Sequence, residues 1–192
     1  PFLARVYWSK GSRESSKGMY NEAIKNYEKG LQINPWLGEL YYNIGVTLHN
    51  KGIIGPTLGY FLKAERFTDT PDLPFYIGSL YLKKNDYDEA ILYFEKAIKY
   101  QFKKKDMLPL QLQLGRIYLA VKDYKNAERT FTKAIEAKKD NAEAYYYLAM
   151  VYLDQGKKEL AIKTLQMVVE IAPDSKEAGY AKTMLNKIEL EK

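Results

Sequence analysis

Residues 75–98 read FYIGSLYLKKNDYDEAILYFEKAI, and this one stretch contains the pattern of a helix, a turn and a second helix. Phe75 and Tyr81 lie one helical turn before and after Gly78, which predicts one face of an amphipathic first helix. Asn85 follows where that helix should end, because Asn and Gly tolerate the left-handed backbone conformation. A small–large–small series at helical spacing then predicts the second helix: Ala90, Phe94 and Ala97.

The same pattern recurs along the whole chain with a period of about 34 residues. Five small residues mark the register, at successive steps of 34, 33, 37 and 34: Gly11, Gly45, Gly78, Gly115 and Ala149. The turn column holds Gly18, Gly52, Asn85, Lys122 and Gly156, and the bulky column of the second helix holds Tyr27, Phe61, Phe94, Phe131 and Leu165. We expect each bulky side chain to fill the space left by small residues on a neighbouring unit. A fixed period of this length indicates a solenoid of stacked supersecondary units.

These columns resemble the tetratricopeptide repeat (TPR) family, whose unit has an L-G-x2-Y core, A-x3-F in its second helix and a closing Pro. The chain departs from that pattern in keeping the closing Pro only as Pro35 and Pro173, and in having polar Lys10 and Glu14 in repeat one. The resemblance implies an all-α fold, a right-handed superhelical solenoid of five helix–turn–helix units plus a C-terminal capping helix.

We expect one domain over residues 1–192. Its repeats are predicted at 4–37, 38–70, 71–107, 108–141 and 142–174, and its capping helix at 175–190. Asp174 is the expected cap residue of that last helix. The step of 37 residues places an insertion of about three residues near 101–106, between repeats three and four.

Cysteine is absent from the chain and histidine occurs once, which removes several kinds of catalytic and metal-binding site. The chain has no Cys and one His, His49, so it offers neither a thiolate site nor a catalytic triad. The glycines of GIIGPTLG, residues 52–59, lack the preceding strand and the following Lys-Ser/Thr of a phosphate-binding loop. We therefore predict a non-enzymatic protein with no cofactor and no small-molecule substrate.

The positive charge of the chain is spread out. The formal net charge is +6, and Lys103, Lys104 and Lys105 form its one tight cluster. That cluster is either a contact for phosphate or an acidic partner, or, as we favour, a solvated loop. Because lysines alternate with glutamates on the second helices, we expect no nucleic-acid partner.

The TPR resemblance implies that first helices line a concave inner face, and this face is where we expect a partner to bind. The predicted groove residues are Trp8, Tyr42, Phe75, Leu112 and Tyr146, with Val46, His49, Arg116 and Met150 in neighbouring rows. On a simple amphipathic interpretation these rows face solvent, and an exposed apolar stripe marks a binding site. We therefore expect an extended peptide or an amphipathic helix of a protein partner to bind there.

One TPR subclass binds acidic chaperone tails through a clamp of Lys, Asn and Arg, and this chain keeps only Asn43 at a matching position. Trp8, Ser12, Asp72 and Tyr76 stand at the other clamp positions, so we expect no such role.

Two alternatives to a peptide-binding scaffold stay open. In the first, the chain is a soluble TPR appendage of a membrane-anchored parent, such as a bacterial O-antigen ligase or polymerase-like envelope protein. In the second, the chain is a scaffold that assembles with copies of itself into a homo-oligomer. No apolar run reaches the roughly 18 residues of a membrane span. We expect a soluble domain, either in the cytoplasm or on the envelope side of such a parent.

Overall fold

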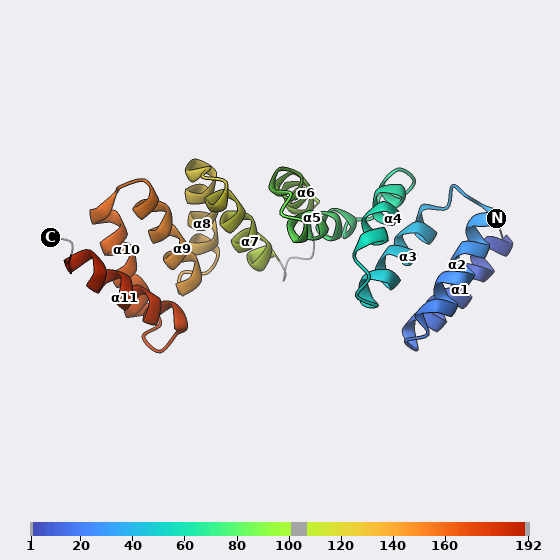
Figure 1. The fold of residues 1–192 in the computed structure, drawn as a ribbon, viewed down its shortest axis with the longest axis horizontal. Coiled ribbons are helices and arrows are strands. Elements are labelled where there is room, and N and C mark those ends of the chain that lie inside the picture. The colour runs from blue at the N-terminus through green and yellow to red at the C-terminus, as the bar shows by residue number, and fades with distance from the viewer. Residues whose placement is uncertain (1, 101–106, 191–192) are drawn as a thin grey trace. The chain divides into compact units, whose positions relative to one another are not determined.

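The computed structural model describes residues 2–100 and 107–190, and within these ranges the chain forms helices and no strand (Figure 1). The helices are α1 (Phe2–Ser16), α2 (Tyr20–Ile33), α3 (Gly38–Asn50), α4 (Gly55–Glu65), α5 (Leu73–Lys83), α6 (Tyr87–Lys99), α7 (Met107–Ala120), α8 (Tyr124–Ala137), α9 (Ala142–Asp154), α10 (Lys158–Ile171) and α11 (Lys176–Leu190). The prediction of an all-α fold made of helix–turn–helix pairs plus a last helix is confirmed. The predicted insertion near 101–106 and the cluster of Lys103, Lys104 and Lys105 lie outside the described residues.

The chain divides into two compact units. Unit 1 comprises residues 1–100 with the helix pairs α1/α2, α3/α4 and α5/α6. Unit 2 comprises residues 101–192 with the pairs α7/α8 and α9/α10, followed by α11. The single domain over 1–192 and the exact repeat boundaries stay predictions.

Each helix pair is joined by the same tight turn. The residue in the turn column has a positive φ in all five pairs: Gly18 (75°), Gly52 (79°), Asn85 (60°), Lys122 (61°) and Gly156 (72°). In the first pair, the N–H of Gly18 donates to the carbonyl of Ser15 at 3.0 Å and the N–H of Met19 donates to that of Glu14 at 3.0 Å. This two-bond arrangement is the Schellman motif, and it recurs in the other four turns. The predicted turn column is confirmed.

The small column and the bulky column meet inside each pair. A Cβ added to Gly45 would lie 2.5 Å from the ring of Phe61, and one added to Gly78 would lie 2.8 Å from the ring of Phe94. Gly11 and Gly115 face Tyr27 and Phe131 in the same way. The expectation that each bulky side chain fills space on a neighbouring unit is therefore incomplete, because each of these rings first fills the space beside the glycine of its own unit.

Some rings also contact the next repeat. Phe61 stacks on Tyr76 with ring centroids 5.3 Å apart, and Phe131 stacks on Tyr147 at 5.7 Å. One bulky side chain thus joins the two helices of its pair and links that pair to the next.

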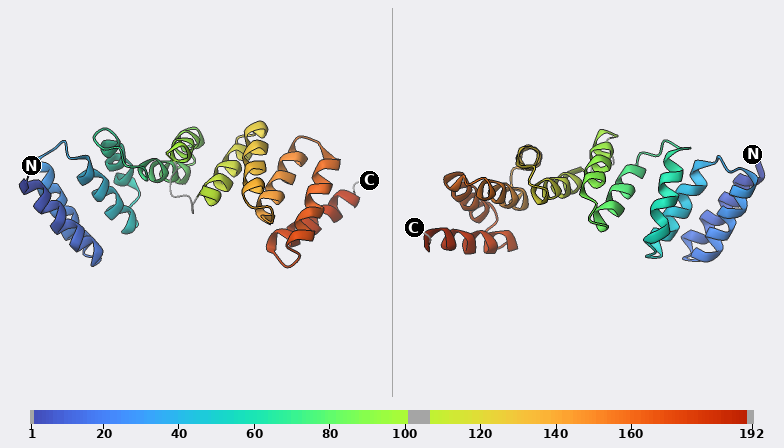
Figure 2. Two further views of the ribbon diagram at one scale, coloured as in Figure 1. Left: turned by 180° about the vertical axis from the view of Figure 1, so that it is seen from behind. Right: turned by 45° about the horizontal axis from the view of Figure 1, so that its top comes forward.

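Helix α11 covers the last apolar surface of unit 2 by packing against α10 and α9. It is the red helix next to the C-terminus in Figure 2. Ala178, Ala181 and Ile188 of α11 are buried in one cluster with Leu165 and Val168 of α10. The cap residue of α11 is Ser175, whose Oγ accepts the N–H of Ala178 at 3.1 Å. The expectation that Asp174 caps this helix is wrong, because the helix begins one residue later than that role requires.

Candidate functional site

In unit 1 three of the predicted groove residues gather around the ring of Tyr76, which was not predicted to belong to the groove. The ring of Tyr76 on α5 lies 6.3 Å from Tyr42, 5.9 Å from Phe75 and 5.6 Å from His49, measured between centroids. All four side chains are partly buried. The first helices α3 and α5 therefore share one continuous aromatic cluster that is still partly open to solvent.

Tyr42 is both a packing residue and a surface residue. Burial of its phenol, with smaller effects of Tyr76 and Asp72, raises the pKa of Tyr42 to about 12. Its ring also lies 6.1 Å from that of Phe61, in the core of the second repeat. Val46 on the same helix is partly buried against that core.

Trp8 belongs mainly to the packing of unit 1. Its indole is partly buried against a cluster that includes Tyr27, Leu40 and Ile44. The indole Nε1 is buried and has no hydrogen-bond acceptor among the described residues. A buried donor without an acceptor reduces stability, so the position of Trp8 depends on the apolar contacts of its ring.

In unit 2 the predicted residues separate into buried and exposed groups. Leu112 is only 8% exposed, so the expectation that it faces solvent is wrong. It lies on α7, which packs against both α8 and α9, and this leaves the residue little open surface. Arg116, one turn further along α7, is exposed, with its guanidinium 5.1 Å from the ring of Tyr147 and 4.0 Å from the carboxylate of Glu143. Met150 on α9 is partly buried.

Tyr146 lies at the junction of α9 and α11. Its ring is 5.4 Å from that of Tyr147 and 5.9 Å from that of Tyr180, which is 56% exposed. Burial, with smaller effects of Tyr147 and Tyr180, raises the pKa of Tyr146. Helix α11 thus adds a ring beside a predicted groove residue, which sequence reasoning missed.

Tyr76 and Tyr147 could have been found from the sequence. Each stands two residues before the small residue of its repeat, Gly78 or Ala149, and each is a tyrosine. A repeated aromatic residue beside the predicted row was the available signal. No equivalent signal exists for Tyr180, because α11 lies outside the repeat pattern.

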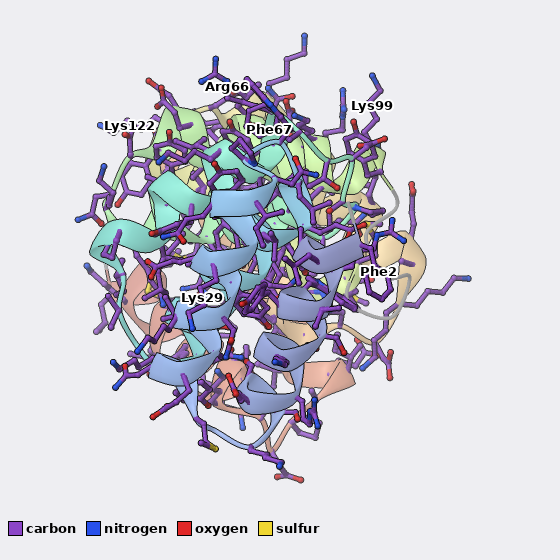
Figure 3. The ribbon with its side chains drawn as sticks, turned by 90° about the vertical axis from the view of Figure 1, so that its right-hand side faces the viewer. Phe2, Lys29, Arg66, Phe67, Lys99 and Lys122 are labelled. Atoms are coloured by element: carbon purple, nitrogen blue, oxygen red, sulfur yellow. The ribbon has the colours of Figure 1, made fainter. Side chains whose placement is uncertain are left out.

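A second aromatic surface of unit 1 lies at the loops that connect successive helix pairs. Trp36 is 70% exposed and packs edge-on against Phe67 at 5.5 Å, and Phe67 stacks on Tyr41 at 6.0 Å. Figure 3 shows Phe67 beside Arg66 at one edge of the molecule. Sequence reasoning missed this surface, because Trp36 and Phe67 follow the helices and belong to no repeat column.

Within residues 2–100 and 107–190, no group of three or more His, Asp or Glu side chains is placed to hold a metal ion. The helices of the same ranges include none with the length and apolar character of a membrane span.

The fold is that of a helical repeat protein. Its helix pairs share a recurring turn and a glycine–ring contact, and a final helix covers the end of the last pair. Models of the tetratricopeptide repeat match residues 118–185 and 76–104, and a model of the TPR repeat matches residues 11–52. The chain belongs to the tetratricopeptide repeat family. Proteins of this family are generally interaction scaffolds that bind other proteins rather than enzymes.

Two curated relatives are similar to this chain over different lengths. A BBSome complex member, the BBS4 homolog of Drosophila melanogaster, is 26% identical over 186 residues, which cover 86% of this chain and 36% of that protein. The photosystem I assembly protein Ycf3 of Acaryochloris marina is 30% identical over 85 residues, which cover 44% of this chain and 51% of that protein. The chain thus spans only about a third to a half of these relatives.

Solved structures show the same fold. The crystal structure of YrrB, described as a TPR protein with an unusual peptide-binding site, matches with a TM-score of 0.79 and 22% identity, over 92% of this chain and 90% of that one. A crystal structure of MamA matches with a TM-score of 0.73 and 21% identity, over 93% of this chain and 95% of that one. At these identities the likeness concerns the fold alone.

Proposed function

We propose that this chain is a protein-interaction scaffold that binds an extended peptide or an amphipathic helix of a partner along the first helices of its repeats. The observation that carries the proposal is the aromatic cluster of Tyr42, His49, Phe75 and Tyr76 on α3 and α5. Rigid rings on neighbouring helices offer a large contact area with little loss of side-chain entropy, as binding hot spots do.

Unit 2 offers a surface with related chemistry. Exposed Arg116 lies over the ring of Tyr147, and Tyr146 lies beside Tyr180. Met150 adds an adaptable apolar side chain. YrrB is named for a peptide-binding site, and the BBS4 homolog and Ycf3 are named for a complex and for assembly. These names agree with a partner that is itself a protein.

The test is a peptide-display selection on the immobilised full chain, followed by affinity measurements with purified peptides. Tyr42→Ala/Tyr146→Ala should weaken binding by about 1–3 kcal/mol for each ring that acts as a hot spot. Because both rings also pack, their removal lowers stability as well, so a second variant is needed. His49→Ala/Arg116→Ala removes side chains from the same faces with less loss of packing, and should weaken binding while the melting temperature changes little.

The matched control is Leu92→Ala/Leu160→Ala, which removes exposed apolar side chains from the second helices α6 and α10. It should leave peptide binding unchanged. Failure to enrich any peptide, or an equal loss of binding in the control, would overturn the proposal.

Two alternatives from the sequence stay predictions: an appendage of a membrane-anchored envelope protein, and a self-assembling scaffold. Light scattering over a concentration series tests self-assembly, since a constant monomer mass rules it out.

A further inference from the structure

A groove with a basic wall lies on unit 2, and its lining includes none of the aromatic residues of the proposed function. Its volume is about 640 Å³, within the range of ligand-binding sites in proteins. Helix α8 contributes Lys125, Arg129 and Lys133, and the turn between α9 and α10 contributes Gln155 and Lys157. Four cations and two carboxylates line it, so positive charge is in excess.

The three cations of α8 follow one line along the helix. Lys125, Arg129 and Lys133 are spaced four residues apart and are exposed. Residues four apart share a helix face and lie about 6 Å apart along the axis. Within the described residues, no salt bridge involves any of the three.

One of the two carboxylates is already engaged. Glu128 lies 3.7 Å from the ammonium of Lys157 and accepts a hydrogen bond from the hydroxyl of Tyr152 at 3.4 Å. The remaining carboxylate, Glu136, lies at the C-terminal end of α8, one turn beyond Thr132. Lys125, Arg129 and Lys133 therefore remain available to form ion pairs with an anionic ligand.

Gln155 adds a second, independent observation. It is one of the residues that line the groove, and its Oε1 is buried with no hydrogen-bond donor among the described residues. A buried acceptor without a donor is costly, and a ligand that brings an N–H relieves that cost. Backbone amides of a peptide supply such donors at every residue except proline.

We propose that this groove binds an extended acidic peptide segment with carboxylates at alternate positions. In an extended chain, every second side chain points the same way, with a repeat of about 6.6–6.8 Å. That repeat is close to the spacing of about 6 Å between successive cations on α8. Three carboxylates in the order acidic–x–acidic–x–acidic can therefore face Lys125, Arg129 and Lys133 together, while a peptide N–H reaches Gln155.

Peptide chemistry fits the groove better than nucleic acid does. Single-stranded nucleic acids are held by stacking of bases on aromatic side chains, and the lining of this groove contains no aromatic residue. The site is separate from the aromatic faces of the proposed function, so either proposal can fail without the other.

The test uses fluorescence anisotropy on the full chain with three labelled probes. The first is a short peptide with three glutamates at alternate positions, the second has the same composition with the glutamates adjacent, and the third is a single-stranded oligonucleotide. The alternating peptide should bind best, and its affinity should fall as salt rises, because the contacts are exposed ion pairs.

Arg129→Gln/Lys133→Gln should weaken binding of the alternating peptide by about tenfold, the effect of losing two favourable exposed ion pairs. Lys163→Gln/Lys182→Gln is the matched control, since it removes the same charge from exposed positions of α10 and α11 outside the groove. Gln155→Leu should weaken binding by a few-fold without lowering the melting temperature, because it removes an acceptor that has no partner in the free chain.

Three results would overturn the proposal. The first is equal loss in the groove and control variants, which means that only net charge matters. The second is equal affinity for the two peptides, which means that the spacing of the cations is irrelevant. The third is no peptide binding, or tighter binding of the oligonucleotide with the same dependence on Arg129 and Lys133.

Discussion

Lys122 holds a φ of 61°, a conformation in which an L side chain crowds the following carbonyl. The turn between α7 and α8 requires this geometry, since the N–H of Asp123 must reach the carbonyl of Tyr118 at 2.8 Å. Glycine adopts the same conformation without the steric cost but loses more entropy on folding. We therefore expect Lys122→Gly to raise the free energy of unfolding by about 0.5–1 kcal/mol, measured by urea denaturation.

The control for this prediction is Lys138→Gly, at the end of α8, where the backbone is extended with a φ of −144°. There glycine relieves no strain, so the substitution should be neutral or destabilising. Equal stabilisation by both substitutions would mean that the left-handed geometry of Lys122 is not the cause.

Tyr42 makes stability depend on pH in the alkaline range. Its pKa is raised from an ordinary value of 10.0 to about 12 by burial. Below pH 10 the phenol is protonated in both states, so its contribution is fully present. As pH rises from 10 through about 12, the unfolded chain loses the proton first, and the free energy of unfolding falls.

Urea denaturation at about pH 9 and about pH 11 measures that fall. Tyr42→Phe should show a shallower decline than the parent chain, but not a flat one, because burial also raises the pKa of Tyr93 and of Tyr146. An unchanged decline in Tyr42→Phe would contradict the assignment.

Single residues show what the sequence could and could not predict. The left-handed turns could be predicted because Gly and Asn occupy four of the five turn positions, and the register assigned Lys122 to the fifth. The cap residue of α11 could not be predicted, because Asp174 and Ser175 are both good cap residues. Only the position at which the helix begins shows that Ser175 is the cap.

At the scale of helix pairs, the glycine–ring contact sets how closely two helices approach. A Cβ on Gly45 would lie 2.5 Å from two ring atoms of Phe61, which is too close for any real contact. Repeat five has Ala149 in the small column instead of Gly, and Leu165 in the bulky column instead of an aromatic residue. The larger side chain at the first position is accommodated by the smaller one at the second. The two positions therefore vary as a matched set.

Gly45→Ala should lower the free energy of unfolding by about 1–3 kcal/mol through overpacking. Phe61→Leu in the same chain should recover part of that loss, so a double-mutant cycle should give a favourable coupling energy. Gly59→Ala on α4 is the control, because no atom lies within 4 Å of its added Cβ. That substitution should stabilise by about 0.5–1 kcal/mol, the ordinary helix preference of Ala over Gly.

Helix packing also explains why Leu112, expected to face solvent, is buried. The sequence shows which residues share a helix face, but a first helix in a stack contacts its own second helix and the helices of the next pair. Leu112 is consequently buried while Arg116, one turn away on α7, is exposed. The amphipathic pattern of a single helix does not separate these two outcomes, because it contains no information on the neighbouring pair.

At the scale of the whole molecule, each compact unit contains buried apolar clusters of its own. The cluster around Tyr27 and Ile44 and the cluster around Phe61 and Ile77 lie in unit 1, and the cluster around Leu165 and Ala178 lies in unit 2. In repeat proteins stability is close to a sum of local and nearest-neighbour contributions. A destabilising substitution is therefore expected to act mainly on the unit that contains it.

The positions of the tryptophans make this expectation measurable. Both tryptophans of the chain, Trp8 and Trp36, lie in unit 1, so their fluorescence reports unit 1, whereas far-ultraviolet circular dichroism reports the helices of both units. Gly45→Ala should move the fluorescence midpoint of urea unfolding. Gly115→Ala, which brings a Cβ within 2.7 Å of the ring of Phe131, should move the dichroism transition and leave the fluorescence midpoint in place. If both substitutions shift both signals equally, residues 1–192 unfold as one cooperative domain, as the sequence predicted, and local stability is shared along the whole array.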